Sequence, residues 1–192
     1  MTYSEYRERT SFSRLELLAH ANGTLIEGPG PEIGMLPAPP LLMFDRILDV
    51  QHRETRGSIV AEQDVDLGAW YFWCHFRHDP VQPGCLGVDA VWQLLGFYLT
   101  LRGAEGTGRA LGCGVVEFNG QIRPHNRVVR YEVEVKRCSA LSDGGVVIGD
   151  GRVLVDGINI YTITNAKVGA FRGIRYPDYP QPSKNSREGA KQ

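Results

Sequence analysis

Hydrophobic and polar residues change their spacing along this chain of 192 residues. Residues 85–101 are almost all apolar, and Asp89 carries their single charge. This run predicts a helix over residues 84–101 that is buried on most of its circumference and ends at Arg102-Gly103. Apolar and charged residues then alternate over residues 129–136, which predicts a strand with one buried and one wet face.

The remaining pattern predicts a short helix and several strands. Ser11 or Ser13 can cap the helix, and Gly23 lies just past its end. Asp156-Gly157 separates two apolar runs and is typical of a hairpin with a type I′ turn. The predicted elements are a helix over 15–20, strands over 41–50, 58–65 and 69–76, and a hairpin formed by 146–155 and 158–168.

One buried helix with antiparallel strands before and after it fits a sheet that wraps around the helix. This is the α+β layout called the hot-dog fold. We expect a single domain over residues 1–172, because a chain of this length fits one core. The polar stretch 173–192 predicts a disordered tail. Gly87 and Gly96 lower helix propensity, so we expect neighbouring backbone to approach the helix closely there.

The composition is that of an ordinary soluble domain. Hydrophobic residues make up 42% and charged residues 22%, and the net charge of −1 gives no global field that favours nucleic acid. The four cysteines form no C-x-x-C pair and the polar N-terminus resembles no signal peptide, so we expect a reducing, cytoplasmic setting. The apolar run 85–101 is shorter than the roughly 20 residues that span a membrane.

Residues 74–89 bring three chemical groups into one short stretch. His75 supplies an imidazole, the side chain best suited to removing a proton at neutral pH. Pro83-Gly84 opens the predicted helix, where free backbone N–H groups favour developing negative charge. Asp89 has apolar neighbours, which favour the neutral form of a carboxylic acid. Proton abstraction beside a carbonyl, followed by loss of an oxygen, requires such a base, oxyanion donor and acid.

Other interpretations of this stretch have less support. Gln93, one helical turn after Asp89, either orients the carboxyl group or serves packing alone. Cys85 at the helix start could be a nucleophile, but proton abstraction followed by loss of an oxygen needs no covalent intermediate. His75-x-x-His78 could suggest a metal site, but apart from Asp79 no third ligand follows at a suitable spacing. We therefore expect no metal.

The order of residues here resembles a known family, the bacterial β-hydroxydecanoyl-acyl-carrier-protein dehydratase/isomerases. The matching signature is His75-Phe76, Asp79-Pro80-Val81, Pro83-Gly84-Cys85-Leu86-Gly87, Asp89-Ala90 and Trp92-Gln93-Leu94. Shorter matches lie at residues 36–39, 45–46, 96–99, 108–112, 118–121, 155–157 and 167–169. The resemblance thus covers roughly residues 15–171.

This resemblance implies a fold, a reaction and a partner. The fold is again the hot-dog fold, in a homodimer whose two sheets join edge to edge and whose active sites are shared. The substrate is an acyl chain linked to phosphopantetheine on acyl carrier protein, and no cofactor or metal takes part. The reaction is dehydration of (3R)-3-hydroxyacyl-acyl-carrier-protein to the trans-2-enoyl thioester in fatty-acid biosynthesis, with trans-2 to cis-3 isomerisation.

The resemblance also implies roles for individual residues. His75 matches the general base and Asp89 the general acid. Five further residues match positions that bind the substrate or face the carrier protein near the tunnel mouth: Val81, Gly84, Gln93, Arg137 and Lys167. For Arg137 and Lys167, an ordinary solvated charge on a strand is an equally open interpretation.

Three alternatives stay open. Related dehydratases without isomerase activity usually carry Glu at the acid position, so Asp89 favours the bifunctional branch over them. A coenzyme A-linked hydratase and a non-catalytic module that binds acyl chains share the same fold, although intact His75 and Asp89 disfavour the module.

Trp73 and Gln82 depart from the family pattern beside the catalytic loop, and the preferred acyl-chain length therefore stays open.

Overall fold

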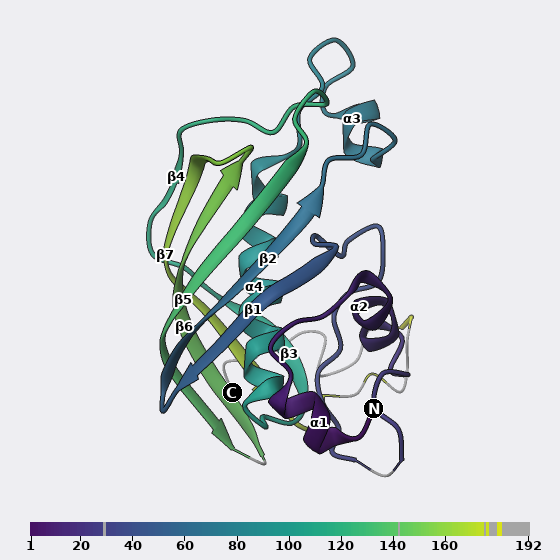
Figure 1. Cartoon of the computed structure of the whole chain (residues 1–192), viewed down its shortest axis with the longest axis vertical. Helices are drawn as coiled ribbons and strands as arrows, with labels where there is room; N and C mark the ends of the chain where they lie inside the picture. The colour runs from purple at the N-terminus through teal and green to yellow at the C-terminus, as the bar shows by residue number, and fades with distance from the viewer. Residues whose placement is uncertain (29, 142, 175, 177–179, 182–192) are drawn as a thin grey trace.

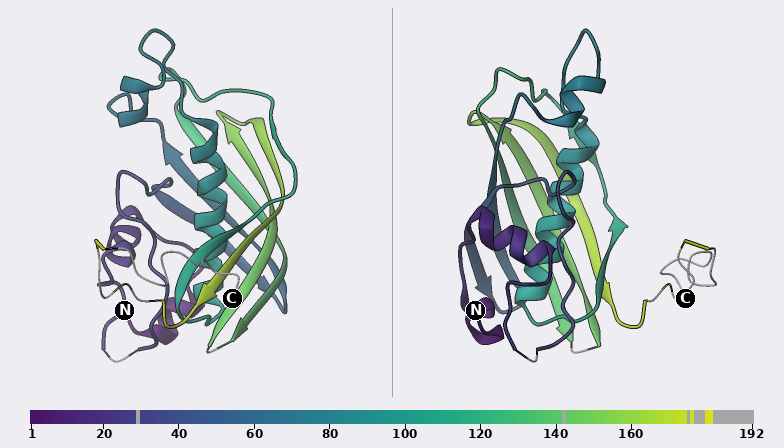
Figure 2. Two further views of the ribbon diagram at one scale, coloured as in Figure 1. Left: turned by 180° about the vertical axis from the view of Figure 1, so that it is seen from behind. Right: turned by 90° about the vertical axis from the view of Figure 1, so that its right-hand side faces the viewer.

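The computed structural model describes residues 1–28, 30–141, 143–174, 176 and 180–181. One long helix, α4 (Gly84–Leu101), crosses the molecule, and a strongly curved sheet wraps around it (Figure 1; Figure 2). The ends of α4 agree with the helix predicted over residues 84–101. Of the predicted tail 173–192, most residues lie outside the described part of the chain, so its disorder stays a prediction.

All strand pairs are antiparallel, and the strand order is β1-β2-β5-β6-β7-β3, with β4 paired to β7. A sheet around one central helix is the predicted hot-dog arrangement. The strands are β1 (Arg46–Arg53), β2 (Arg56–Asp64), β3 (Thr107–Gly112), β4 (Val116–Phe118), β5 (Val128–Leu141), β6 (Gly144–Val155) and β7 (Ile158–Phe171).

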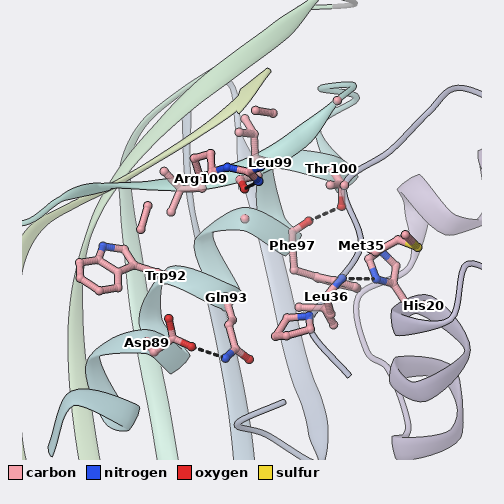
Figure 3. A pocket seen from close by; sticks show the side chains of 18 of the residues that line it. His20, Met35, Leu36, Asp89, Trp92, Gln93, Phe97, Leu99, Thr100 and Arg109 are labelled. Atoms are coloured by element: carbon pink, nitrogen blue, oxygen red, sulfur yellow. Dashed lines mark hydrogen bonds between the residues drawn. The ribbon is translucent and has the colours of Figure 1, made fainter. Parts of the chain in front are cut away.

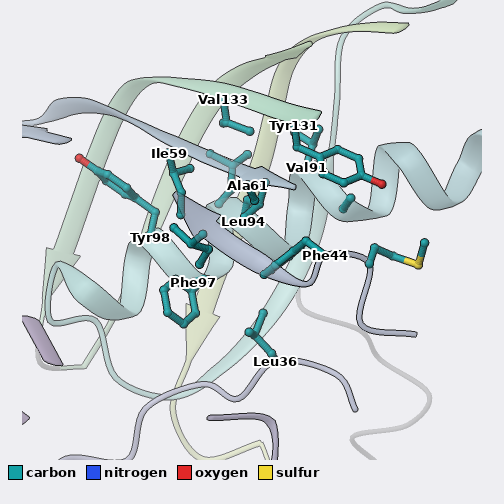
Figure 4. Close-up of a cluster of buried hydrophobic side chains, with 14 of the residues drawn as sticks. Leu36, Phe44, Ile59, Ala61, Val91, Leu94, Phe97, Tyr98, Tyr131 and Val133 are labelled. Atoms are coloured by element: carbon teal, nitrogen blue, oxygen red, sulfur yellow. The ribbon is translucent and has the colours of Figure 1, made fainter. Parts of the chain in front are cut away.

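The inner face of the sheet follows from the alternation in the sequence. On β5 the apolar residues of 129–136 are buried and the charged ones between them face outward, as predicted. Gly149 and Gly151 of β6 let α4 lie close, because a Cβ at Gly151 would come within 2.7 Å of the Val91 side chain. Figure 4 shows the core between α4 and the sheet, where Leu94 and Tyr131 are fully buried.

The predicted hairpin forms between β6 and β7. Asp156 and Gly157 have φ angles of 48° and 86°, as a type I′ turn requires at both central positions. The Asp156 carboxylate also accepts hydrogen bonds from the backbone N–H groups of Arg127 and Val128, each 3.0 Å long, which fixes the start of β5 beside the turn.

Two predicted strands are corrected. Residues 69–76 form a helix, α3 (Trp70–Cys74), and not a strand; the His75 N–H donates to the Tyr71 carbonyl at 2.8 Å. A run of consecutive aromatic residues has no period of two. The strand was predicted from apolar character alone, which does not distinguish a strand from a short helix. The first strand begins at Arg46 rather than at residue 41, because the Met43 N–H donates to the Gln93 side chain instead of to a strand.

The glycines of α4 are approached by side chains, which corrects the expected approach of backbone. A Cβ at Gly87 would lie 2.8 Å from the Tyr161 ring, whereas a Cβ at Gly96 would lie 3.7 Å from Val168. Gly87 is therefore needed to accommodate the Tyr161 ring, whereas a methyl group at Gly96 would make only an ordinary van der Waals contact.

Two short helices precede the sheet, α1 (Tyr3–Glu8) and α2 (Arg14–Ala21). Ser13 caps α2 by accepting from the Glu16 N–H, and this settles the choice between Ser11 and Ser13. The pattern did not predict α1. The helix α1 lies against the C-terminal end of α4 (Figure 1), and α2 contacts α4 through His20, whose ring lies 4.9 Å from that of Phe97.

By length and composition, α4 is the one helix in the described residues that could cross a membrane. However, 72% of its residues are buried inside the fold. The helix is therefore explained as the core helix of this sheet.

Candidate active site

His75 follows α3 directly and begins the loop that leads to α4. Its Nδ1 lies 3.0 Å from the Val81 carbonyl oxygen. A carbonyl only accepts, so Nδ1 carries the proton and donates it, which leaves the lone pair of Nε2 available as a base. The Val81 N–H in turn donates to the His75 carbonyl at 2.8 Å. Val81, predicted to bind substrate, thus holds the imidazole in position in this structure.

An ion pair between Arg123 and Asp79 fixes the same loop from outside. Arg123 also donates to the Pro80 carbonyl at 3.4 Å. The Phe76 ring stacks on the His75 imidazole with 4.0 Å between the centroids. Side-chain and backbone contacts therefore restrain the imidazole on several sides.

Asp89 lies on the second turn of α4 and is half-buried among the buried residues Val88 and Ala90. Its Oδ2 accepts a 2.6 Å hydrogen bond from Gln93 Nε2. Its Oδ1 has no hydrogen-bond partner among the described residues. One oxygen is thus held in place, and the other is available to a substrate.

The Gln93 amide is itself fixed in one orientation. Its Nε2 donates to the Leu41 carbonyl at 2.8 Å, and its Oε1 accepts from the Met43 N–H at 3.1 Å. Backbone groups of these types allow only one placement of the amide oxygen and nitrogen. Of the two interpretations of Gln93, the structure supports the one in which it orients Asp89.

Gly84 is the first residue of α4, and its N–H is among those that a helix start leaves without an intrahelical partner. A Cβ at this position would lie 2.7 Å from Cε1 of Phe118 on β4. Only a glycine at position 84 leaves room for the Phe118 ring. This packing reason for the glycine cannot be seen in the sequence. The absence of a side chain also leaves the N–H open to a small group.

A pocket of about 200 Å³ runs along α4, with Asp89, Trp92 and Gln93 toward one end and Thr100 toward the other (Figure 3). Its opposite walls come from residues 34–41, β3 and β7. His75 is not among the residues that line it. Within the described residues, the pocket beside Asp89 is therefore formed without the imidazole of the same chain.

Arg137 and Lys167 are both exposed and belong to one row of the sheet. Ile148 on β6 pairs with Arg137 on β5 and with Lys167 on β7. Because paired residues point to the same face, the two basic residues lie on the outer surface two strands apart, at about 10 Å. Neither forms an ion pair with another described residue.

Sequence reasoning missed two parts of this region. The anchors of Gln93, at residues 41 and 43, carry no sequence signal because they act through backbone atoms. Gln82, a departure from the family pattern, is only 1% exposed, so its polar side chain is buried beside the start of α4. Its polar side chain just before Pro83-Gly84 was the available signal.

Residues 36–164 of the chain match the family described as FabA-like domain. The chain belongs to this FabA-like family. The matched region contains the loop of His75, Gly84 at the start of α4, and Asp89. Family and fold together support a hot-dog dehydratase or a related enzyme, while the dehydratase/isomerase branch within the family stays a prediction.

Two solved structures share the fold of this FabA-like chain. The dehydratase heterocomplex ApeI:P of Xenorhabdus doucetiae is similar at 13% identity with a TM-score of 0.50, over 76% of this chain and 86% of that one. The dehydratase domain of RzxB from Pseudomonas fluorescens is similar at 8% identity with a TM-score of 0.52, over 83% of this chain and 49% of that one. Identities this low show the shared fold alone.

Proposed function

We propose that this protein dehydrates (3R)-3-hydroxyacyl thioesters on acyl carrier protein to trans-2-enoyl thioesters. The observation that carries the proposal is that a FabA-like chain holds an imidazole and a carboxyl group, each fixed by hydrogen bonds and each with one atom left unbonded. His75 offers a free Nε2 lone pair, and Asp89 offers one free carboxyl oxygen beside a pocket that runs along an apolar helix.

The reaction uses each group once. His75 Nε2 removes the proton from C2 of the thioester, and the Gly84 N–H stabilises the negative charge that develops on the thioester oxygen. The bond between C3 and its hydroxyl oxygen then breaks. Protonated Asp89 supplies the proton that lets this oxygen leave as water. Gln93 keeps the carboxyl group turned toward the pocket.

The proposal includes a homodimer with shared sites. His75 does not line the pocket beside Asp89 of its own chain, so a second copy would supply the base there. β3 ends the strand order, and among the described residues it pairs only with β7. Leu111, Val115 and Phe118 leave apolar surface exposed on this side of the sheet, where a second sheet could join.

Isomerisation is the finer part of the proposal. Asp89 stands where dehydratases without this activity usually carry Glu, and the surrounding Cys85-Leu86-Gly87 and Trp92-Gln93 resemble the bifunctional branch. The same base would move a proton from C4 to C2 through a dienolate held at the Gly84 N–H.

Product analysis tests both parts. The purified protein is given a medium-chain 3-hydroxyacyl thioester, once on acyl carrier protein and once on coenzyme A, and cis and trans enoyl products are resolved. We expect faster turnover on the carrier protein and both product isomers. Trans product alone would remove the isomerase assignment, a preference for coenzyme A would favour the hydratase, and no turnover of either thioester would refute the proposal.

A further inference from the structure

A second cavity lies behind the far end of the active-site pocket. It has a volume of about 280 Å³, and Leu25, Ile26 and Ile33 line it together with the carboxylate residue Glu32. Only His20 and Met35 line both cavities. We call these two side chains the partition. They lie side by side at the far end of the pocket, away from Asp89 (Figure 3).

The pocket points from the proposed chemistry toward this partition. Asp89 and Thr100 lie eleven residues apart on α4, which corresponds to about 16 Å along the helix axis. An extended chain gains about 1.2 Å per backbone bond, so this length suits an acyl chain of roughly a dozen bonds. An acyl chain that reacts beside Asp89 would therefore direct its methyl end toward His20 and Met35.

His20 is the rigid half of the partition. It is 2% exposed, and burial lowers its pKa to about 4, so the ring is neutral at ordinary pH. Its Nδ1 accepts from the Leu36 N–H at 3.3 Å, which leaves the proton on Nε2 to donate to the Tyr6 hydroxyl at 3.2 Å. Tyr6 lies 2.5 Å from the Thr100 hydroxyl, which donates to the Phe97 carbonyl.

This chain of hydrogen bonds uses every N–H and O–H donor of the three side chains. No free donor and no charge of His20, Tyr6 or Thr100 is left to face the pocket. These three side chains therefore offer nothing that would bind a hydroxyl or carboxylate terminus, and Arg109, which also lines the pocket, donates to the Gly108 carbonyl at 2.8 Å. The network also ties α1 and α2 to α4, so the position of His20 depends on the N-terminal helices.

Met35 is the movable half. It is 64% exposed, makes no hydrogen bond to another described residue, and has the flexible, unbranched side chain that fills irregular gaps. A Met side chain changes rotamer at little cost when one side faces solvent. Met35 lines both cavities, so its side chain lies where the two approach each other.

We propose that His20 and Met35 set the longest acyl chain that the enzyme accepts. This inference rests on the proposed dehydratase function. With Met35 in its present position the chain ends at the partition; without the Met35 side chain a longer acyl chain reaches the cavity formed by Leu25, Ile26 and Ile33.

The test compares kcat/KM for long-chain and medium-chain 3-hydroxyacyl thioesters in variants and wild type. Met35→Ala should raise the long-to-medium ratio by about tenfold, as expected when two further methylenes are buried. Adding Ile33→Trp, which fills the second cavity, should return the ratio to the wild-type value. Leu15→Ala is the control, because Leu15 is an exposed residue of α2 that lines neither cavity.

The outcomes separate this inference from the function on which it rests. If wild type turns over no 3-hydroxyacyl thioester of any length, the proposed function fails. If wild type is active but Met35→Ala keeps the wild-type ratio, the partition does not set chain length. A ratio that rises equally in Leu15→Ala, or that Ile33→Trp does not restore, also overturns the inference.

Discussion

Gln93 Nε2 donates a 2.6 Å hydrogen bond to Asp89 Oδ2, one turn earlier on α4. The same amide is clamped between the backbone of Leu41 and that of Met43. Asp89 is therefore oriented by a segment some fifty residues away in sequence. This hydrogen-bond network couples α4 to the segment that forms the opposite wall of the pocket.

This coupling predicts the behaviour of Gln93→Leu. The substitution removes the donor to Asp89 and leaves the Met43 N–H and the Leu41 carbonyl without partners, so the free energy of unfolding should fall by about 1–3 kcal/mol. Because the carboxyl group is no longer held, kcat should fall by about tenfold or more while KM changes little. Steady-state kinetics and urea unfolding measure the two effects separately. A loss of stability with unchanged kcat would show that Gln93 serves packing alone.

The contact between Gly84 and Phe118 predicts a second, steric effect. Gly84→Ala places a methyl group 2.7 Å from the Phe118 ring, and such overpacking should cost about 1–3 kcal/mol of stability. Gly96→Ala is the matched control on the same helix, because its methyl group would lie 3.7 Å from Val168 and should raise stability by up to about 1 kcal/mol. Thermal unfolding of the two variants should thus shift in opposite directions. Equal shifts would contradict the close approach of Phe118.

Much of the fold follows from local sequence pattern. The ends of α4, the buried face of β5 and the turn at Asp156-Gly157 each depend on residues close together in sequence. The helix α3 did not follow, since a run of aromatic residues fits a buried strand and a short helix equally well. Tyr6 on α1 gave no signal either, because its partners His20 and Thr100 are distant in sequence.

The site was predictable only in part for the same reason. His75, Gly84 and Asp89 lie in one stretch of sequence, and Gln93 lies at the helical spacing from Asp89. Backbone partners such as the Val81 carbonyl have no residue-type preference, so a sequence cannot reveal them. Gly84 was expected to leave space for a substrate carbonyl, and the structure adds the Phe118 ring as a second occupant of that space.

His20 predicts a dependence of stability on pH. Burial lowers its pKa to about 4, below the ordinary value of 6.5. The unfolded chain therefore binds the proton at higher pH than the folded chain, and stability is lost as pH falls from about 6.5 to about 4. The loss attributable to His20 should approach ~3 kcal/mol. His20→Gln can keep both hydrogen bonds without titrating, so its unfolding free energy should fall less steeply over this window. Identical slopes for the two proteins would contradict the assignment.

If Arg137 and Lys167 dock the acyl carrier protein, removing their positive charge should slow turnover only of substrates carried by that protein. Reversing both charges with Arg137→Glu and Lys167→Glu should lower kcat/KM on acyl carrier protein by about tenfold at low salt and less at high salt. Turnover of a free pantetheine thioester should not change, because that substrate has no acidic protein to dock. Arg127→Glu is the control. Arg127 is exposed and lies ten residues before Arg137, which places the two residues about 30 Å apart along an extended strand. Equal losses on both substrates would show a structural defect instead.

His75 does not line the pocket beside Asp89 of its own chain, and the proposed shared site predicts complementation between inactive variants. His75→Ala and Asp89→Asn should each lower kcat by about 10²–10⁴-fold, because each removes one proton-transfer group. When the two variants exchange subunits, a heterodimer has one site that carries both lesions and one site that carries neither. Activity should then return to as much as half the wild-type level per heterodimer. If heterodimers confirmed by mass stay inactive, each site draws both residues from one chain.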